Sequence, residues 1–191
     1  MLNTRTAGIL LAAVQLFSGR SALADSYSDT VTLFKNSGAS ASFFNTCYGY
    51  AVFPTIGKAG LVVGGAHGKG RVYLHGKYVG DASVTQLSVG LQAGGQAYSQ
   101  IVFLEDERAF KDFTSGHFEF GADASAVAIT AAAQASAGTA GASASASGGK
   151  KDAVTAGSYH NGIAVFTIVK GGAMYQATVA GQKFKFTPQS Q

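Results

Sequence analysis

Apolar residues along the middle of the chain come in short runs separated by glycine. Runs of this length, rich in valine and tyrosine and bounded by turn residues, are typical of β-strands rather than of amphipathic helices. The pattern begins near residue 50 and continues almost to the end of the sequence. We predict strands over residues 50–53, 59–65, 70–74, 83–94, 99–104, 154–159, 162–170, 173–179 and 183–186.

Residues 83–94 give the clearest strand pattern, because two kinds of side chain alternate along them. One face carries Leu87, Val89 and Leu91, and the other face is polar or glycine-rich. We therefore predict a half-buried strand whose leucine and valine side chains pack into the core. The core residues predicted for the whole domain are Phe53, Ile56, Val62, Leu87, Val89, Leu91, Ile101, Phe103, Phe110, Phe113, Val165 and Ile168.

Helical patterns are confined to two places. Residues 27–48 carry an apolar stripe that includes Val31 and Phe34, which predicts a helical or irregular segment. Residues 105–113, EDERAFKDF, predict a helix because acids occupy the first turn and cations follow. The predicted fold class is therefore α+β and mostly β: glycine-rich antiparallel strands in a curved barrel-like or two-layer sheet, with an N-terminal helical segment and one mid-chain helix.

The first residues of the chain have the pattern of a secretory leader. Arg5 precedes an apolar run over residues 7–17, and the motif ALA, which ends at Ala24, is a small-residue cleavage site. The run is shorter than the roughly 18 apolar residues that a membrane anchor needs. We predict a signal peptide over residues 1–24, cleaved before Asp25, and a single domain after it that is periplasmic or secreted.

Composition and charge exclude several classes of protein. Only 13% of the 191 residues are charged, and Cys47 is the one cysteine, so no internal disulfide can form and a small buried side chain is expected. Residues 25–80 and 124–191 are basic, whereas residues 81–123 are acidic. This balance is mild and lacks a basic stripe with interleaved aromatics, so no nucleic-acid partner is expected. Residues 131–149 hold only small side chains and predict a flexible insertion.

The densest glycine stretch, LVVGGAHGKGRVYLHGKYVG over residues 61–80, raises the question of a phosphate-binding loop. Dinucleotide and P-loop motifs place glycines at fixed spacings between a strand and a helix, whose N-terminus holds the phosphate. Neither spacing occurs here, and the residues that follow predict a strand, a turn and another strand. We therefore expect glycine to mark bends in a curved sheet, and no cofactor. Hairpin turns are also predicted at residues 159–162 and 170–172.

Catalytic or metal-binding chemistry has little support in the sequence. The four histidines lie beside glycine turns and in no metal-ligand spacing, and no G-x-S-x-G nucleophile motif occurs. A histidine can still meet an aspartate in space, so a hydrolase or transferase stays open as an alternative, although we predict no enzyme and no metal site. The histidines are His67, His75, His117 and His160.

Three separated segments resemble, in the same order, the SYLF domain family: YAVFPTIGKAGLVVGGAHGKGRVY, VTQLSVGLQAGGQAYSQIVFL and GGAMYQATVAGQKFKF. The likeness covers residues 43–186. It implies a lipid-binding module without enzymatic activity. Eukaryotic members bind phosphoinositide membranes and some regulate actin, whereas bacterial members are exported envelope proteins. For an exported bacterial protein we do not expect actin as a partner.

The resemblance therefore implies peripheral binding of phospholipid at an anionic membrane surface in the bacterial envelope. Lys58, Lys69, Arg71 and Lys77 cluster in sequence around the glycine-rich stretch, and these are the predicted lipid-binding residues. Each cation near an anionic surface contributes about 1 kcal/mol. The alternative for each is an ordinary solubilising charge.

Two other classes of protein stay in view. One is a non-enzymatic structural or protein-interaction role in envelope integrity, with an envelope protein as partner and no lipid. The other is an integral outer-membrane barrel, which is disfavoured because bands of about ten residues with aromatic girdles do not recur regularly.

Overall fold

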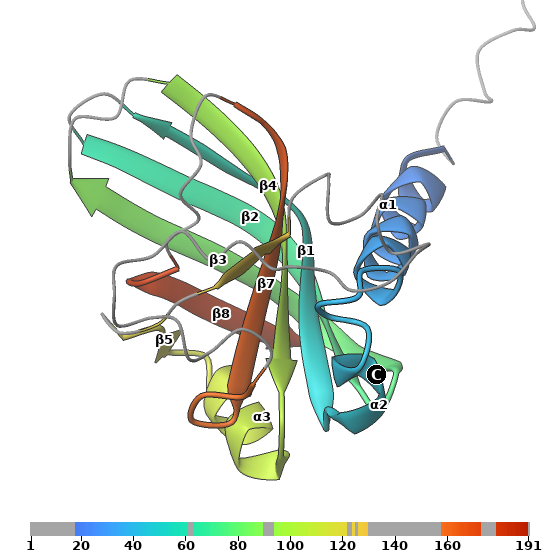
Figure 1. Ribbon diagram of the computed structural model, residues 1–191. Coiled ribbons are helices and arrows are strands. Elements are labelled where there is room, and N and C mark those ends of the chain that lie inside the picture. The colour runs from blue at the N-terminus through green and yellow to red at the C-terminus, as the bar shows by residue number, and fades with distance from the viewer. Residues whose placement is uncertain are drawn as a thin grey trace, which may run out of the picture.

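The computed structural model of the protein describes residues 18–60, 63–89, 94–121, 124, 126–129, 158–172 and 179–190. Within these residues eight strands form one curled sheet, in the order β5-β8-β3-β2-β1-β4-β7-β6 (Figure 1). Neighbouring strands are antiparallel, except that β6 runs parallel to β7. The strands are β1 (Gly49–Gly60), β2 (Val63–Leu74), β3 (Lys77–Val89), β4 (Gly94–Leu104), β5 (Phe118–Glu119), β6 (Val127–Ile129), β7 (Ile163–Gly172) and β8 (Gln182–Pro188).

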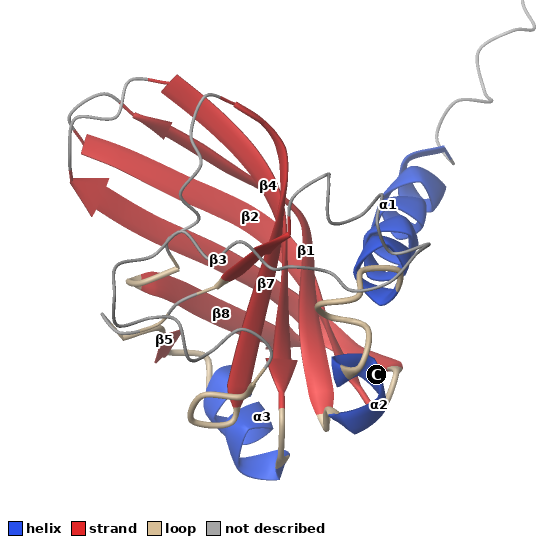
Figure 2. Cartoon of the chain, viewed as in Figure 1, coloured by secondary structure: helices blue, strands red, loops and turns tan. Residues whose placement is uncertain are grey.

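Three helices accompany the sheet in the described part of the chain (Figure 2). They are α1 (Ser18–Lys35), α2 (Phe43–Thr46) and α3 (Glu107–Thr114). Strands clearly predominate, so the predicted mostly-β class with a curved antiparallel sheet, an N-terminal helical segment and one mid-chain helix is confirmed. The helix α1 crosses the predicted cleavage site before Asp25. No helix among the described residues is long and apolar enough to span a membrane.

The sheet separates two apolar clusters. On its inner, concave side, residues of β1, β2, β3, β4, β7 and β8 pack together and against α3. On its outer side, Phe34 of α1 and Phe43 of α2 pack onto β1, β4 and β7. Figure 1 shows α1 and α2 beside β1, and α3 at one end of the strands. A Cβ atom at Gly49 would lie 2.8 Å from the Phe110 ring, so α3 lies at the end of the sheet where β1 begins.

The hairpin between β2 and β3 confirms the strand, turn and strand predicted for RVYLHGKYV. His75 and Gly76 form its two-residue turn, with φ angles of 47° and 77°. A turn with both central residues in the left-handed region matches the right-handed twist of the flanking strands. The predicted turn at residues 159–162 is confirmed by Asn161 and Gly162, which also have positive φ, between His160 and Ile163.

Several predicted strand boundaries are wrong, because glycine was taken to interrupt strands that in fact run through it. The predicted strand 59–65 straddles the end of β1 and the start of β2, and residues 170–172 lie inside β7 at a register irregularity instead of forming a turn. The glycines on the inner side are required by packing. A Cβ atom at Gly70 would lie 2.5 Å from the Phe53 ring, and one at Gly68 would lie 2.6 Å from Ile56 Cγ1.

The core prediction is largely confirmed. Phe110 is partly buried, and Val62 and Leu91 lie outside the described residues, as does the side chain of Val89. Residues 131–149 and 173–178 also lie outside them. The confirmed core residues are Phe53, Ile56, Ile101, Phe103, Phe113, Val165 and Ile168.

Leu87 is 84% exposed, so its predicted place in the core is wrong. The inward positions of β3 are taken by Ala82, Val84 and Gln86, and strand alternation then places Leu87 on the outer side. Gln86 is tolerated inside because its Nε2 donates a hydrogen bond to the Ala180 carbonyl at 2.8 Å. The register with β8, rather than the more apolar face of β3, decides which side chains point inwards.

Candidate functional site

Beyond α1 and α2, no helix in the described part of the chain covers the outer side of the sheet. The outward-pointing residues of β1, β2 and β3 are exposed at the end where β1 finishes, while their neighbours along each strand are buried. Cross-strand register brings these positions together on one surface, which we call the open outer face. Its residues are Thr55, Gly57, Ala59, Gly65, His67, Lys69, Thr85, Leu87, Gly95, Ala97, Lys170, Lys183 and Lys185.

Lysines from three strands meet on the open outer face. Lys69 of β2 lies opposite Ser83 of β3, which lies opposite Lys185 of β8. Neighbouring strands are about 4.8 Å apart, so the backbones of these two lysines are separated by roughly 10 Å. Lys170 of β7 reaches the same surface, where its Nζ donates a hydrogen bond to Thr55 Oγ1 at 3.2 Å.

Few acids offset these cations. Lys183 pairs with Glu119 of β5, with Nζ 3.5 Å from Oε2. Within the described part of the chain, neither Lys69 nor Lys185 takes part in an ion pair. The open outer face therefore carries an excess of positive charge.

The four predicted site residues do not form one cluster. Lys69 is exposed on the open outer face, and Lys77 is exposed beside the β2–β3 turn, at the opposite end of these strands. Lys58 is only 9% exposed and alternates inwards with Ile56 on β1, so its position does not favour a surface role.

Arg71 is engaged within the molecule. Its guanidinium lies 4.4 Å from the centre of the Tyr27 ring on α1 and 5.3 Å from that of Tyr78, and its Nε is 3.9 Å from Asp81 Oδ1. These contacts tie α1 to β2 and β3. Arg71 is therefore better placed to position the helix than to meet a ligand.

Sequence reasoning missed Lys170, Lys183 and Lys185. The two-residue spacing of Lys183 and Lys185 is the signal that places both on one face of a strand. Their meeting with Lys69 depends on the pairing of β8 with β3, about a hundred residues apart in sequence, and no local pattern reveals that pairing.

A shallow hollow of about 440 Å³ adjoins Lys170 on this surface. Glycine is not needed there for packing, since a Cβ atom at Gly57 would have no neighbour within 4 Å. At Gly95 the nearest atom would be the Lys58 carbonyl oxygen at 3.8 Å. The small residues therefore leave this part of the surface open. The hollow is lined by Gly57, Lys58, Ala59, Gly95, Gln96, Ala97 and Lys170.

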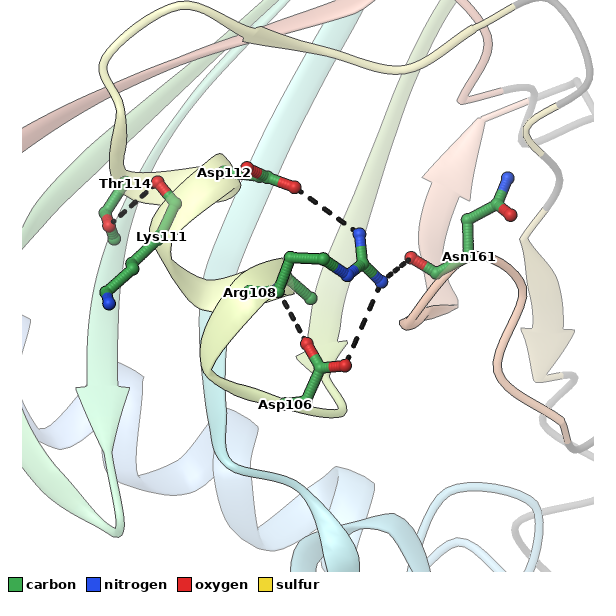
Figure 3. Close-up of polar contacts among 7 residues, drawn as sticks. Asp106, Arg108, Lys111, Asp112, Thr114 and Asn161 are labelled. Carbon is green, nitrogen blue, oxygen red and sulfur yellow. Dashed lines mark hydrogen bonds and ion pairs between the residues drawn. The ribbon is translucent and has the colours of Figure 1, made fainter.

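Asp106 and Asp112 of the mid-chain segment lie at the other end of the sheet, where they pair with Arg108 (Figure 3). Arg108 of α3 has Nη2 3.9 Å from Asp106 Oδ2 and Nη1 3.5 Å from Asp112 Oδ2, and its Nη2 donates a hydrogen bond to the Asn161 carbonyl at 3.3 Å. Asp106 also caps the helix by accepting a hydrogen bond from the Ala109 amide at 2.7 Å. These groups stabilise α3 and its contact with the β7 turn.

The four histidines lie on different elements and do not converge. His67 is on β2, His75 forms the β2–β3 turn, His117 follows α3, and His160 precedes β7. The described residues hold no group of three histidine, cysteine or acidic side chains that could bind a metal. Cys47 is half-buried, and burial raises the pKa of its thiol, which disfavours the reactive thiolate.

The fold and this surface define a small curled-sheet domain with a basic, exposed face. A family model described as "Ysc84: Las17-binding protein actin regulator" matches residues 85–187, which is more than half of the chain. The chain therefore belongs to this family, and its resemblance to SYLF domains is confirmed. The family is described by binding to a protein, Las17, and by regulation of actin.

The chain is also similar to "Beta cell expansion factor A" of Aeromonas veronii. The two sequences are 26% identical over 156 residues, which cover 81% of this chain and 51% of the relative. The chain thus spans about half the length of this curated relative.

Proposed function

We propose that this protein binds anionic phospholipid membranes peripherally through the open outer face of its sheet. The observation that carries the proposal is the meeting of Lys69, Lys170, Lys183 and Lys185, from β2, β7 and β8, on a surface that no helix in the described part of the chain covers. Membership of the SYLF-type family supports the same class of ligand.

The expected strength of binding follows from the charges. Each lysine near an anionic surface contributes about 1 kcal/mol, so the three that have no acidic partner among the described residues contribute about 3 kcal/mol. Binding of this strength is reversible and weakens as salt screens the surface potential. The hollow beside Lys170 is open to solvent, which suits contact with headgroups in a bilayer.

The leader pattern supports an extension of this proposal to location. Export after cleavage before Asp25 places the domain in the bacterial envelope, where phosphatidylglycerol and cardiolipin are anionic lipids. We therefore propose a periplasmic or secreted protein that does not meet actin. Fractionation of cells that express the full chain, with N-terminal sequencing of the product, tests this extension; an uncleaved cytoplasmic product contradicts it.

A protein partner is the second candidate function. The matched family is described by a protein interaction, and Leu87 and the adjoining hollow offer an apolar contact area on the same face. Such a role in envelope integrity needs no enzymatic activity and no lipid.

Co-sedimentation with vesicles tests the membrane proposal. We compare Lys69→Gln/Lys185→Gln with the control Lys77→Gln/Lys111→Gln, which removes the same charge from the opposite end of the sheet, where β1 begins. Arg71 is left intact because it holds α1. The first variant is expected to bind phosphatidylglycerol vesicles about thirtyfold more weakly, since two cations contribute about 2 kcal/mol. The control is expected to keep most of the affinity.

Two outcomes contradict the proposal. Equal losses in both variants would show a non-specific effect of net charge, and unchanged binding in the first variant would place the contact elsewhere. Both comparisons require that every variant keeps the melting temperature of the unaltered protein.

A further inference from the structure

The two sides of the sheet have inverted polarity at the end where β1 finishes. On the inner side, Lys58, Gln86 and Gln96 are all buried, and the register places Lys58 beside Gln96. On the outer side, Leu87 is 84% exposed and Ala59 is exposed as well. In a protein surrounded by water, apolar side chains normally lie inside and long polar ones outside.

The polar interior at this end is stabilised by hydrogen bonds. Gln182 Nε2 donates to Gln100 Oε1 at 3.1 Å and to the Tyr98 hydroxyl at 3.1 Å, and Gln100 Nε2 donates to Gln182 Oε1 at 2.8 Å. The inward polar side chains are thus part of the fold. At this end of the sheet the arrangement leaves Leu87 of β3 and Ala59 of β1 facing outwards.

The outer surface around Leu87 is flat. Leu87 lies opposite Gly65, and a Cβ atom at Gly65 would have the Gln86 carbonyl oxygen, at 3.7 Å, as its nearest neighbour. Gly65 lies opposite Ala59, which lies opposite Gly95. A leucine therefore projects from a surface of small residues, and nothing in the described part of the chain covers it.

We infer that this end of the open outer face enters the interfacial region of the bilayer, with Leu87 in contact with acyl chains. The inference rests on the proposed membrane binding and adds its orientation. Lys69 lies opposite Ser83, four residues before Leu87, which is about 13 Å along the strand. Interfacial elements bury their apolar face about 5–10 Å deep, so the lysines lie at the level of the headgroup phosphates.

The positive charges of the open outer face favour contact with an anionic bilayer over contact with a second copy of the chain. Two copies that met through their open outer faces would bring Lys69, Lys183 and Lys185 of one copy against the same lysines of the other, and like charges oppose such contact. An anionic bilayer supplies negative charge for the lysines and an apolar layer for Leu87.

The absence of tryptophan from the sequence makes a direct test available. The Leu87→Trp variant carries a single tryptophan, which lies on the open outer face and can be excited selectively over the tyrosines. The matched control, Leu33→Trp, places it on α1, where Leu33 is 44% exposed. Each full domain is titrated with phosphatidylglycerol vesicles whose acyl chains are plain or brominated. We expect a blue shift and bromine quenching for Leu87→Trp and little of either for Leu33→Trp.

A second variant, Leu87→Glu, is expected to lower vesicle affinity about tenfold, since burial of a leucine side chain is lost. The melting temperature is expected to stay unchanged, because the side chain is exposed.

Co-sedimentation with vesicles distinguishes a failure of the proposed membrane binding from a failure of the proposed orientation. If the Leu87→Trp variant binds vesicles without a blue shift of its fluorescence, the orientation is overturned and membrane binding still holds. If the protein does not bind vesicles, both are overturned. A blue shift that rises with protein concentration without vesicles shows self-association and overturns the inference.

Discussion

Gln100 and Gln182 join two strands across the interior of the curled sheet. β4 and β8 are separated by three strands in the sheet order, yet these side chains exchange two hydrogen bonds and are fully buried. An amide pair of this kind fixes how tightly the sheet curls, because both partners must meet to satisfy their polar groups.

Substitution of one member of this pair is therefore expected to be costly. Gln182→Leu leaves the Gln100 amide buried without its partner, and we expect a loss of about 1–3 kcal/mol in the free energy of unfolding, measured by urea denaturation. The double variant Gln100→Leu/Gln182→Leu is expected to lose less than the sum of the two single losses. Additive losses would show that the pair is not coupled.

Glycine has two different roles in these strands. Gly70→Ala places a methyl group against the Phe53 ring and is expected to cost about 1–3 kcal/mol. Gly57→Ala, on β1, has free space and is expected to be neutral or to stabilise by up to about 1 kcal/mol. Thermal and urea denaturation of both variants measures the contrast. Equal effects would contradict the assignment of Gly70 to the inner side.

Two buried tyrosines predict a loss of stability in alkali. Burial raises the pKa of Tyr50 and of Tyr98 to about 12, from an ordinary value near 10. Above pH 10 the unfolded chain releases these protons while the folded chain keeps them, so the free energy of unfolding falls as pH rises from 10 to 12. Urea denaturation across this window should show a shallower fall for Tyr50→Phe than for the unaltered protein. An identical slope would contradict the prediction.

At the scale of elements, α1 packs against the sheet through the buried Phe34 side chain and the cation–π contact of Tyr27. Phe34 is inaccessible between α1 and the sheet, and Tyr27 covers Arg71. Phe34→Ala is expected to destabilise the protein by about 3–5 kcal/mol. Its neighbour provides the control, because Leu33 is exposed and Leu33→Ala is expected to change stability by less than about 0.5 kcal/mol. Similar losses from both would show that α1 does not pack as described.

The elements that the sequence predicts well are those with local signals. The acids and cations of residues 105–113 mark α3, and the glycine after His75 marks the β2–β3 turn. The strand boundaries are less accessible to prediction, because an inward glycine and a terminal glycine look alike in sequence. The outward position of Leu87 escapes prediction for a related reason: register with β8 overrides the apolar pattern of β3.

The sequence predicts only part of the candidate site, because the pairing of distant strands leaves no local pattern. Lys69 is found from its neighbourhood in sequence, whereas the lysines that accompany it come from β7 and β8 and meet it only through sheet pairing. Lys58 is near Lys69 in sequence, but strand alternation turns it inwards. Proximity in sequence alone therefore does not place a lysine on the open outer face.

At the scale of the whole molecule, charge is segregated along the sheet. The acids at α3 pair with Arg108 and Lys111 at the end where β1 begins. The lysines of the open outer face lie towards the other end of the sheet. This separation gives the molecule an orientation in the field of an anionic surface. The exposed Leu87 lies towards the same end as the lysines, so electrostatic approach and apolar contact use one face.

The most direct test of membrane binding is a vesicle titration of the unaltered chain from Asp25 to Gln191 at low and moderate salt. Phosphatidylglycerol, cardiolipin and neutral phosphatidylcholine vesicles are compared by co-sedimentation. Binding to both anionic lipids that weakens as salt increases, with little binding to phosphatidylcholine, is the predicted result. Absence of binding to every vesicle, or equal binding to neutral and anionic lipid at all salt concentrations, would contradict a membrane role for the basic face.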